Sequence, residues 1–251
     1  MRIRQIALVG EDLDRAKAEI VDVLGLGKDY PDPGVGHFGL HNAVWPVGDT
    51  FLEVVAPVQA GTTAGRLLEK RGGDGGYMVI MQVDDMAAAR RHVADIGVRI
   101  VHETDRDDGK VACSHLHPRD VGGAILSLDA MTPKERWEWG GPDWQTNVRT
   151  DISLEIVGAE LQGDDPEAMA TRWGEVMQRP VSYRDGRWIV GVDGGEIRFV
   201  PVSDGRGEGL RAFDVKVRDP DAVRARAKAR GAVDADGTVK LCGTRVELVK
   251  A

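Results

Sequence analysis

The chain has 251 residues, of which 42% are apolar and 29% charged, and its formal net charge is −8 at pH 7. This composition is typical of a globular protein with a real core, built as one large domain or two of ordinary size. No basic tract is longer than the pair Arg90-Arg91. An acidic surface of this kind does not attract phosphate backbones or anionic headgroups, so we expect neither a nucleic acid nor a membrane as partner.

Signals for secretion or membrane insertion are not expected in this chain. The N-terminus turns acidic at Glu11 after a short apolar run and has no small-residue cleavage site. No run of about 18 apolar residues is available to span a bilayer. Cys113 and Cys242 are far apart and lack CxxC spacing, which indicates two reduced thiols. We therefore expect a cytoplasmic protein, monomeric or homodimeric.

The first part of the chain is predicted to form a strand, a helix and further strands. Residues 3–9 have the alternation of a strand, and residues 12–25 carry apolar positions at helical spacing and end at a glycine. Residues 37–57 are predicted to form two strands joined by a tight turn at Gly48-Asp49. Glycine at the first turn position suits a type II′ hairpin.

The same order of elements returns three times along the chain. Residues 77–83 are predicted to form a strand and residues 84–96 a helix that begins at an aspartate, followed by three strands within residues 98–129. Similar units begin at Asp151 and at Leu210. Four such units account for nearly the whole chain, and a repeat of this kind predicts an α+β fold.

The repeated β-α-β-β-β unit resembles the vicinal oxygen chelate superfamily. The resemblance rests on the order of elements, on the sequences VDD at 83–85 and VRD at 217–219, and on the hairpin that closes each unit. The superfamily includes glyoxalase I, methylmalonyl-CoA epimerase, extradiol dioxygenases and bleomycin-resistance proteins. Within it, the sequence HLHPRDVGGAIL at 115–126 is similar to the closing hairpin of methylmalonyl-CoA epimerase.

The resemblance implies four βαβββ units that form two glyoxalase-like domains. The first domain would span residues 1–130 and the second residues 149–251, joined by a linker at 131–148 that is rich in Pro, Gly and Trp. Each pair of units would curl into a half-open barrel around a cavity. We expect the site in the first domain and a structural role for the second.

Relatives hold a divalent metal with side chains of the first and last strands of each unit, and this chain matches that pattern only in part. In the first unit the positions fall on Gln5 and Glu53, which are suitable ligands. In the second they fall on Met78 and Ser127, and a thioether and a hydroxyl are poor ligands for such ions. The remaining positions, in the third and fourth units, are Asp151, Arg198, Ala212 and Glu247.

The cofactor therefore stays open: a divalent metal is possible, but the ligand set is incomplete. Which units close the cavity is open as well. If the first two units are neighbours, they contribute Gln5, Glu53, Met78 and Ser127. If the first unit pairs with the fourth, Glu247 joins Gln5 and Glu53.

Glu53 is unusual because it lies within an apolar strand. An ionised carboxylate buried there without a partner is costly, so Glu53 faces either water or a cavity in which its charge has a use. A two-residue turn at Gly48-Asp49 would pair Val44 with Glu53. Asn42 would then lie beside Glu53 on the same face, and His41 would point the other way.

His115 and His117 are two residues apart on a predicted strand, so their side chains would share one side. They either line the cavity across from Glu53 or lie on a solvent-facing strand edge. A carboxylate facing imidazoles suits proton transfer near neutral pH.

Two functional hypotheses follow, both with a small-molecule ligand. The first is a lyase or isomerase that acts on a carbonyl or thioester compound by proton transfer, with or without the assistance of a metal. Glu53, His115 and His117 would be catalytic, and Gln5, Asn42, Met78 and Ser127 would line the substrate site. The second is a metal-free protein that sequesters a small molecule, because Met78 and Ser127 suit an apolar pocket better than a cation.

Overall fold

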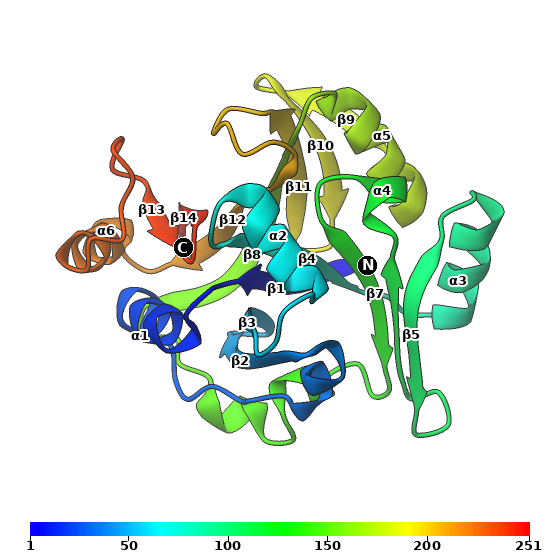
Figure 1. Ribbon diagram of the computed structural model, residues 1–251, viewed down its shortest axis with the longest axis horizontal. Coiled ribbons are helices and arrows are strands. Elements are labelled where there is room, and N and C mark those ends of the chain that lie inside the picture. Colours follow the sequence, from blue (N-terminus) through cyan, green and yellow to red (C-terminus); the bar gives the residue numbers. More distant parts are fainter.

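The computed structural model describes residues 1–251 and contains two seven-stranded mixed sheets flanked by helices (Figure 1). The strands of the first sheet are β1 Arg2–Val9, β2 Leu40–Val47, β3 Thr50–Pro57, β4 Gly75–Gln82, β5 Ile100–Arg106, β6 Val111–Leu116 and β7 Ile125–Met131. Its helices are α1 Leu13–Leu24, η1 Pro33–Phe38, α2 Thr63–Arg71, α3 Met86–Asp95 and α4 Pro118–Val121. The strand order is β2-β3-β1-β4-β7-β6-β5.

The second sheet repeats this arrangement. Its strands are β8 Ser153–Gly163, β9 Val181–Arg184, β10 Arg187–Val192, β11 Gly195–Pro201, β12 Gly209–Val217, β13 Val239–Leu241 and β14 Thr244–Lys250, and its helices are α5 Pro166–Met177 and α6 Pro220–Ala229. The order is β13-β14-β12-β8-β11-β10-β9. Short helices η2 Glu138–Gly140 and η3 Trp144–Asn147 lie in the segment between the sheets. The α+β fold with two domains of this kind is confirmed.

Two of the four units have fewer strands than the βαβββ pattern that the family resemblance implies. The second and third units have three strands after the helix, but the first has only β2 and β3 and the fourth only β13 and β14. In the first unit the missing strand is replaced by a loop that carries η1, and Pro and Gly in residues 31–39 disfavour a regular strand. Its place in the ladder is reduced to a single bridge between Tyr30 and Val44.

The main helix of each unit begins in the same way. Asp12, Asp85, Asp165 and Asp219 are the N-cap residues of α1, α3, α5 and α6, and each side chain accepts a hydrogen bond from a backbone N–H of the first turn. Such a cap satisfies donors that have no partner inside the helix. The aspartate after the first strand of each unit is thus a local signal for the turn from strand to helix.

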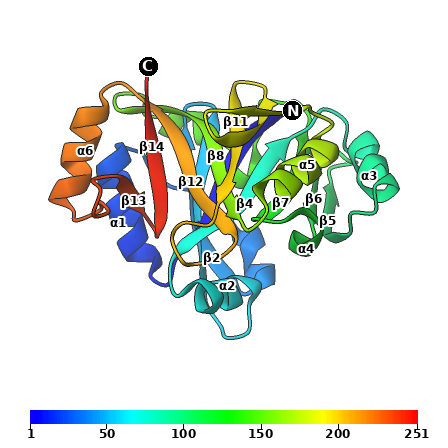
Figure 2. The same ribbon diagram turned by 90° about the horizontal axis from the view of Figure 1, so that it is seen from above.

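The two faces of the first sheet have different environments. Ile6 and Leu8 on β1 belong to a large core cluster that runs on into the second sheet, whereas Ala7 and Val9 belong to a smaller cluster on the opposite face. This alternation is the period of two expected of a strand. α1 packs against α6 on one side of the molecule, and α4 packs against α5 on the other (Figure 2).

Two arginines tie the domains together through main-chain carbonyls. Arg71, at the end of α2, donates to the carbonyl oxygen of Glu208 at 2.8 Å, and Arg206 donates to that of Asp74 at 2.6 Å. Arg71 belongs to the first domain and Arg206 to the second, so each arginine bonds the other domain. No helix of the chain combines the length and the apolar character that crossing a bilayer requires.

The β2–β3 hairpin has the predicted register. Val44 pairs with Glu53 and Val47 with Thr50, while His41 is exposed on the other face. Gly48 has a φ of 60°, as the first position of the turn requires. The turn also lies against β8, because a Cβ added at Gly48 would overlap the carbonyl oxygen of Leu154.

We predict that Gly48→Ala destabilises the protein more than Gly194→Ala. Both glycines have positive φ, 60° and 84°, and placing alanine there costs roughly 1–2 kcal/mol. At Gly194 nothing lies within 4 Å of the added Cβ, so only Gly48→Ala adds an overlap, worth roughly another 1–3 kcal/mol. Urea unfolding measures the difference, and equal losses in the two variants would refute the close contact between the hairpin and β8.

Candidate active site

A cavity of about 680 Å³ lies on the face of the first sheet that carries the smaller core cluster. Strands of the first and the second unit contribute to its wall, so these two units close the cavity together. The lining side chains that carry chemistry are Gln5, Asp32, Glu53, Tyr77, Met78, His102, Arg106, Cys113, His115, Asp129 and Trp139.

Glu53 lies in this cavity and is held by two amides. Gln5 Nε2 donates to Glu53 Oε2 at 2.8 Å, and Asn42 Nδ2 donates to Glu53 Oε1 at 2.6 Å. Only 6% of Glu53 is exposed. Gln5 lines the cavity as expected, whereas Asn42 lies behind the carboxylate and acts through it. Each carboxylate oxygen retains a second lone pair, so Glu53 can still accept a proton.

Other donors fix the orientation of both amides. The indole N–H of Trp137 donates to Gln5 Oε1 at 2.7 Å, and the backbone N–H of Asp32 donates to Asn42 Oδ1 at 2.9 Å. Because the amide oxygens are taken, the amide N–H groups must point at Glu53. Trp137 comes from the segment between the domains, which therefore helps to build the site.

A second carboxylate, Asp129 on β7, was missed by the sequence analysis. Ser127 Oγ donates to Asp129 Oδ1 at 2.5 Å, and the indole N–H of Trp139 donates to Oδ2 at 2.6 Å. Ser127 is fully buried behind Asp129 and does not line the cavity. The signal was present in the sequence, since Asp129 lies two residues after Ser127 and so faces the same side of the strand.

Both carboxyl groups hold protons more tightly than usual. Burial raises the pKa of Glu53 to about 7 even though the amides of Asn42 and Gln5 oppose the shift. Burial likewise raises the pKa of Asp129 to about 7 against the bonds from Ser127 and Trp139, and the charge of Glu53 adds to this effect. The cavity thus contains two carboxyl groups that exchange protons near neutral pH.

His115 lines the cavity but is a weak base there. It lies beside His102, with ring centroids 4.9 Å apart, and near Phe38 at 6.1 Å. Burial and the neighbouring His102 lower the pKa of His115 to about 4. The imidazole is neutral at physiological pH, so an acid role as an imidazolium does not suit it.

His117 is not where the sequence analysis expected it. β6 ends at Leu116, and His117 is the N-cap of α4, where its Nδ1 accepts a hydrogen bond from the backbone N–H of Arg119 at 3.1 Å. Pro118 begins the helix and ends the alternation that would have placed both histidines on one face. His117 is absent from the cavity wall.

The side chains present do not fit the four-ligand metal site typical of relatives. No group of three or more His, Cys, Asp or Glu side chains is placed to hold a metal ion. Gln5 and Glu53 bond each other, and Met78, which lines the cavity, offers a thioether that is a poor ligand for hard cations.

The corresponding face of the second domain is filled by ion pairs. Arg198 donates to both oxygens of Asp214, at 2.5 and 2.6 Å, and to Glu160 at 3.3 Å. Glu160, not Asp151, is the residue of β8 that pairs with Arg198. Asp151 precedes that strand. These charges neutralise one another, and the structural role of this domain stays a prediction.

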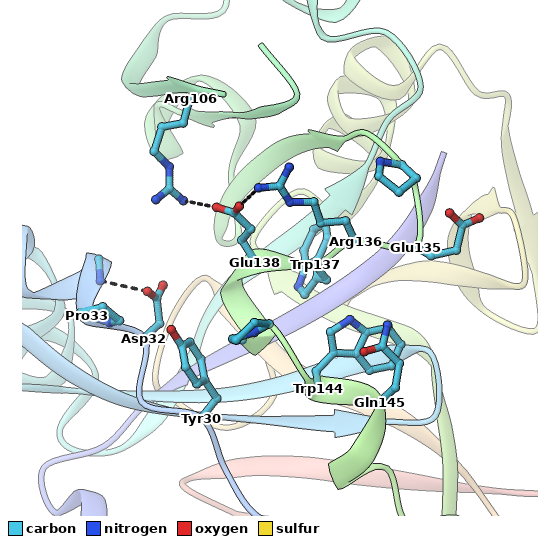
Figure 3. Close-up of a pocket in the computed structure, with 14 residues that line it drawn as sticks. Tyr30, Asp32, Pro33, Arg106, Glu135, Arg136, Trp137, Glu138, Trp144 and Gln145 are labelled. Atoms are coloured by element: carbon cyan, nitrogen blue, oxygen red, sulfur yellow. Dashed lines mark hydrogen bonds and ion pairs between the residues drawn. The ribbon is translucent and has the colours of Figure 1, made fainter. Parts of the chain in front are cut away.

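A polar groove of about 810 Å³ adjoins the cavity and shares Asp32, Gly34 and Arg106 with it. Figure 3 shows Arg106 and Arg136 directed at Glu138 from two sides. The distance from Arg106 Nη2 to Glu138 Oε2 is 3.0 Å. The groove is the larger space, but the Glu138 carboxylate is paired with arginines, so we place the chemistry at Glu53 and Asp129.

We predict that the two carboxyl groups lower the stability of the protein as the pH rises. Their pKa values are higher in the folded than in the unfolded chain, so the native state binds more protons between about pH 4 and pH 7. Each group then costs up to roughly 3–4 kcal/mol above that window. Glu53→Gln or Asp129→Asn should flatten the fall in unfolding free energy from pH 5 to pH 8, measured with urea.

Glu167→Gln is the matched control, because Glu167 is exposed on α5. Its pH profile should match that of the wild type. Profiles for Glu53→Gln and Asp129→Asn that also match it would contradict the raised pKa values.

Three comparisons relate the chain to known proteins. It is 26% identical over 136 residues to ethylmalonyl-CoA/methylmalonyl-CoA epimerase of Cereibacter sphaeroides, covering 52% of this chain and 98% of that protein. In structure it is similar to a variant of 4-hydroxymandelate synthase from Streptomyces coelicolor (TM-score 0.71, 15% identity, 92% of this chain and 75% of that one) and to a hypothetical protein from Staphylococcus aureus (TM-score 0.68, 13% identity, 99% of each). The family model of the glyoxalase-like domain matches residues 6–177. The chain therefore belongs to the glyoxalase-like family of the vicinal oxygen chelate superfamily.

Proposed function

We propose that this protein is an isomerase that moves a proton at a carbon next to a carbonyl or thioester group. The observation that carries the proposal is the pair of buried carboxyl groups, Glu53 and Asp129, in one cavity. Both have a pKa of about 7, and a general base or acid works best when its pKa lies near the working pH.

The positions of the two groups suit a reaction on two faces of one carbon. Glu53 is on β3 and Asp129 on β7, with β1 and β4 between them in the curved sheet. A small substrate between the walls would present one face to each. One carboxylate would remove the proton, and the other, in its protonated form, would return a proton from the opposite side. Such a transfer inverts the carbon.

The substrate class is proposed from one relative. The epimerase of Cereibacter sphaeroides is named for ethylmalonyl-CoA and methylmalonyl-CoA, which are thioesters with an acidic carbon. At 26% identity this likeness suggests a thioester for the present chain and leaves the acyl group open. Methylmalonyl-CoA is accordingly a suitable first probe.

We predict that the enzyme exchanges the α-hydrogen of methylmalonyl-CoA for deuterium in D₂O and inverts the configuration of the α-carbon. Glu53→Gln and Asp129→Asn should each reduce inversion by at least about 100-fold. Each variant should still exchange the α-hydrogen of the enantiomer whose C–H bond faces the remaining carboxylate. The two variants should therefore retain exchange activity toward opposite enantiomers. Proton NMR of the separate enantiomers measures both rates.

Glu167→Gln again serves as the control and should behave as the wild type. Full inversion in Glu53→Gln would exclude Glu53 as a proton carrier. Exchange activity toward the same enantiomer in both variants would exclude the arrangement with one carboxylate on each side of the carbon.

We also predict that removal of divalent ions leaves this activity unchanged. The ligand set around Glu53 is incomplete, and both of its oxygens accept amide N–H groups. Exchange rates before and after dialysis against EDTA, with metal content measured on both samples, provide the check. Loss of activity that stoichiometric metal restores would contradict the metal-independent mechanism.

A metal-free binding protein remains the second candidate. About half of the cavity-lining residues are apolar, Met78 and Ile80 among them, and such a wall suits sequestration of an apolar ligand. Tight binding of the probe without any hydrogen exchange in D₂O would favour this function over the isomerase.

A further inference from the structure

Tyr77 has an unusual position in the cavity wall. The pairing of β1 with β4 shifts between Ala7 and Leu8, which pair with Met78 and Gly76, so Tyr77 is the extra residue of a β-bulge. A bulge re-aims a side chain, and here Tyr77 and its neighbour Met78 both line the cavity. A regular strand would have sent them to opposite faces.

The hydroxyl of Tyr77 has no partner within the protein. Tyr77 is only 8% exposed, and no protein group forms a hydrogen bond with its hydroxyl, which can therefore reach a ligand in the cavity. The hydroxyl oxygen itself is not fully buried, so water can reach it from the cavity. A ligand acceptor in the cavity can take the place of that water and accept a hydrogen bond from the hydroxyl.

The N-terminus of α2 lies at the same cavity. α2 has nine residues, and its first two, Thr63 and Ala64, line the wall together with Tyr77. Thr62 caps the helix by accepting a hydrogen bond from the N–H of Gly65. The N–H groups of Thr63 and Ala64 lie ahead of any intrahelical acceptor, and the positive end of the helix dipole favours negative charge there.

We propose that the Tyr77 hydroxyl and the N-terminus of α2 form an oxyanion-binding subsite, which takes the carbonyl, enolate or carboxylate oxygen of the substrate. The inference rests on the proposed function and names a further catalytic residue for it. It also supplies what the incomplete metal ligand set does not: a group that stabilises negative charge on oxygen.

The chemistry balances without any further reactant. When Glu53 removes a proton from carbon, the C–H bond breaks, the proton moves to the carboxylate, and the electron pair delocalises onto the carbonyl oxygen. The negative charge therefore leaves Glu53 and arrives at the oxygen that Tyr77 would bond. Donors preorganised for such a charge are a large source of rate enhancement.

Tyr77 remains a donor throughout this step. Burial first, and then the charge of Glu53, raise the pKa of Tyr77 to about 12, with Arg66 opposing the shift. The phenol thus stays protonated at working pH. Tyr77 and Glu53 both line the same cavity.

The test uses oxalate as the probe, because its binding requires no turnover. Isothermal titration calorimetry at pH 6 is suitable, since Glu53 and Asp129, with pKa values of about 7, are then mostly protonated and do not repel the anion. Tyr77→Phe should weaken oxalate binding by roughly tenfold or more. Tyr183→Phe, at an exposed tyrosine of the second domain, is the matched control and should bind as the wild type does.

A second pair of variants tests the helix N-terminus. Thr63→Pro removes one N–H at the first helical position, where proline is tolerated, and Thr62 has the extended backbone (φ −70°, ψ 157°) that a following proline requires. Thr63→Ala removes the same side chain but keeps the N–H. Weaker binding in Thr63→Pro than in Thr63→Ala is expected.

The outcomes separate this subsite from the proposed isomerase. Unchanged oxalate affinity in Tyr77→Phe, or no binding of oxalate to the wild type at millimolar concentration, would overturn the subsite whatever happens to methylmalonyl-CoA. Weaker binding in Tyr77→Phe, with Tyr183→Phe unchanged, would support the subsite even if methylmalonyl-CoA were not turned over.

Discussion

The site depends on keeping a carboxylate inside an apolar strand, and a chain of hydrogen bonds makes this possible. Trp137 and the backbone of Asp32 orient Gln5 and Asn42, whose amides hold the two oxygens of Glu53. A buried carboxyl group without such partners would be far costlier. The donors favour the charged form and burial favours the neutral form, and the balance leaves the pKa of Glu53 near neutrality.

This requirement explains why the segment between the two sheets packs so closely on the first. Trp137 donates a hydrogen bond to Gln5, which in turn donates to Glu53, and Trp139 donates directly to Asp129. Arg4 is fully buried against this segment, with its guanidinium within 5.3 Å of the ring centroids of Phe51 and Trp137. The sequence predicts only a linker at residues 131–148, but the indoles of Trp137 and Trp139 in this segment complete the polar shell of both carboxyl groups.

The repeats and the hairpin could be predicted because local rules decide them. The aspartate caps and the glycine turn depend on neighbouring residues, and they fix the register that puts Asn42 beside Glu53. Tyr77 could not be placed in this way, because the β-bulge that re-aims it has no clear signal in a single sequence. The break at His117 does have a local signal, since Pro118 stands at the first position of the helix that follows. The prediction carried the strand alternation past that proline and therefore misplaced His117. The value of His115 as a base also depends on burial, which only the folded chain reveals.

The proposed chemistry needs two carboxyl groups of one cavity with pKa values near neutral pH, and a direct titration of these groups is its sharpest test. Carbon-13 NMR of protein labelled at the side-chain carboxyl carbons of Asp and Glu follows each group from pH 4 to pH 9. We predict two carbons with midpoints near pH 7, one missing in Glu53→Gln and the other in Asp129→Asn. Completion of every carboxyl titration below about pH 5.5, close to the ordinary range of Asp and Glu, would contradict it.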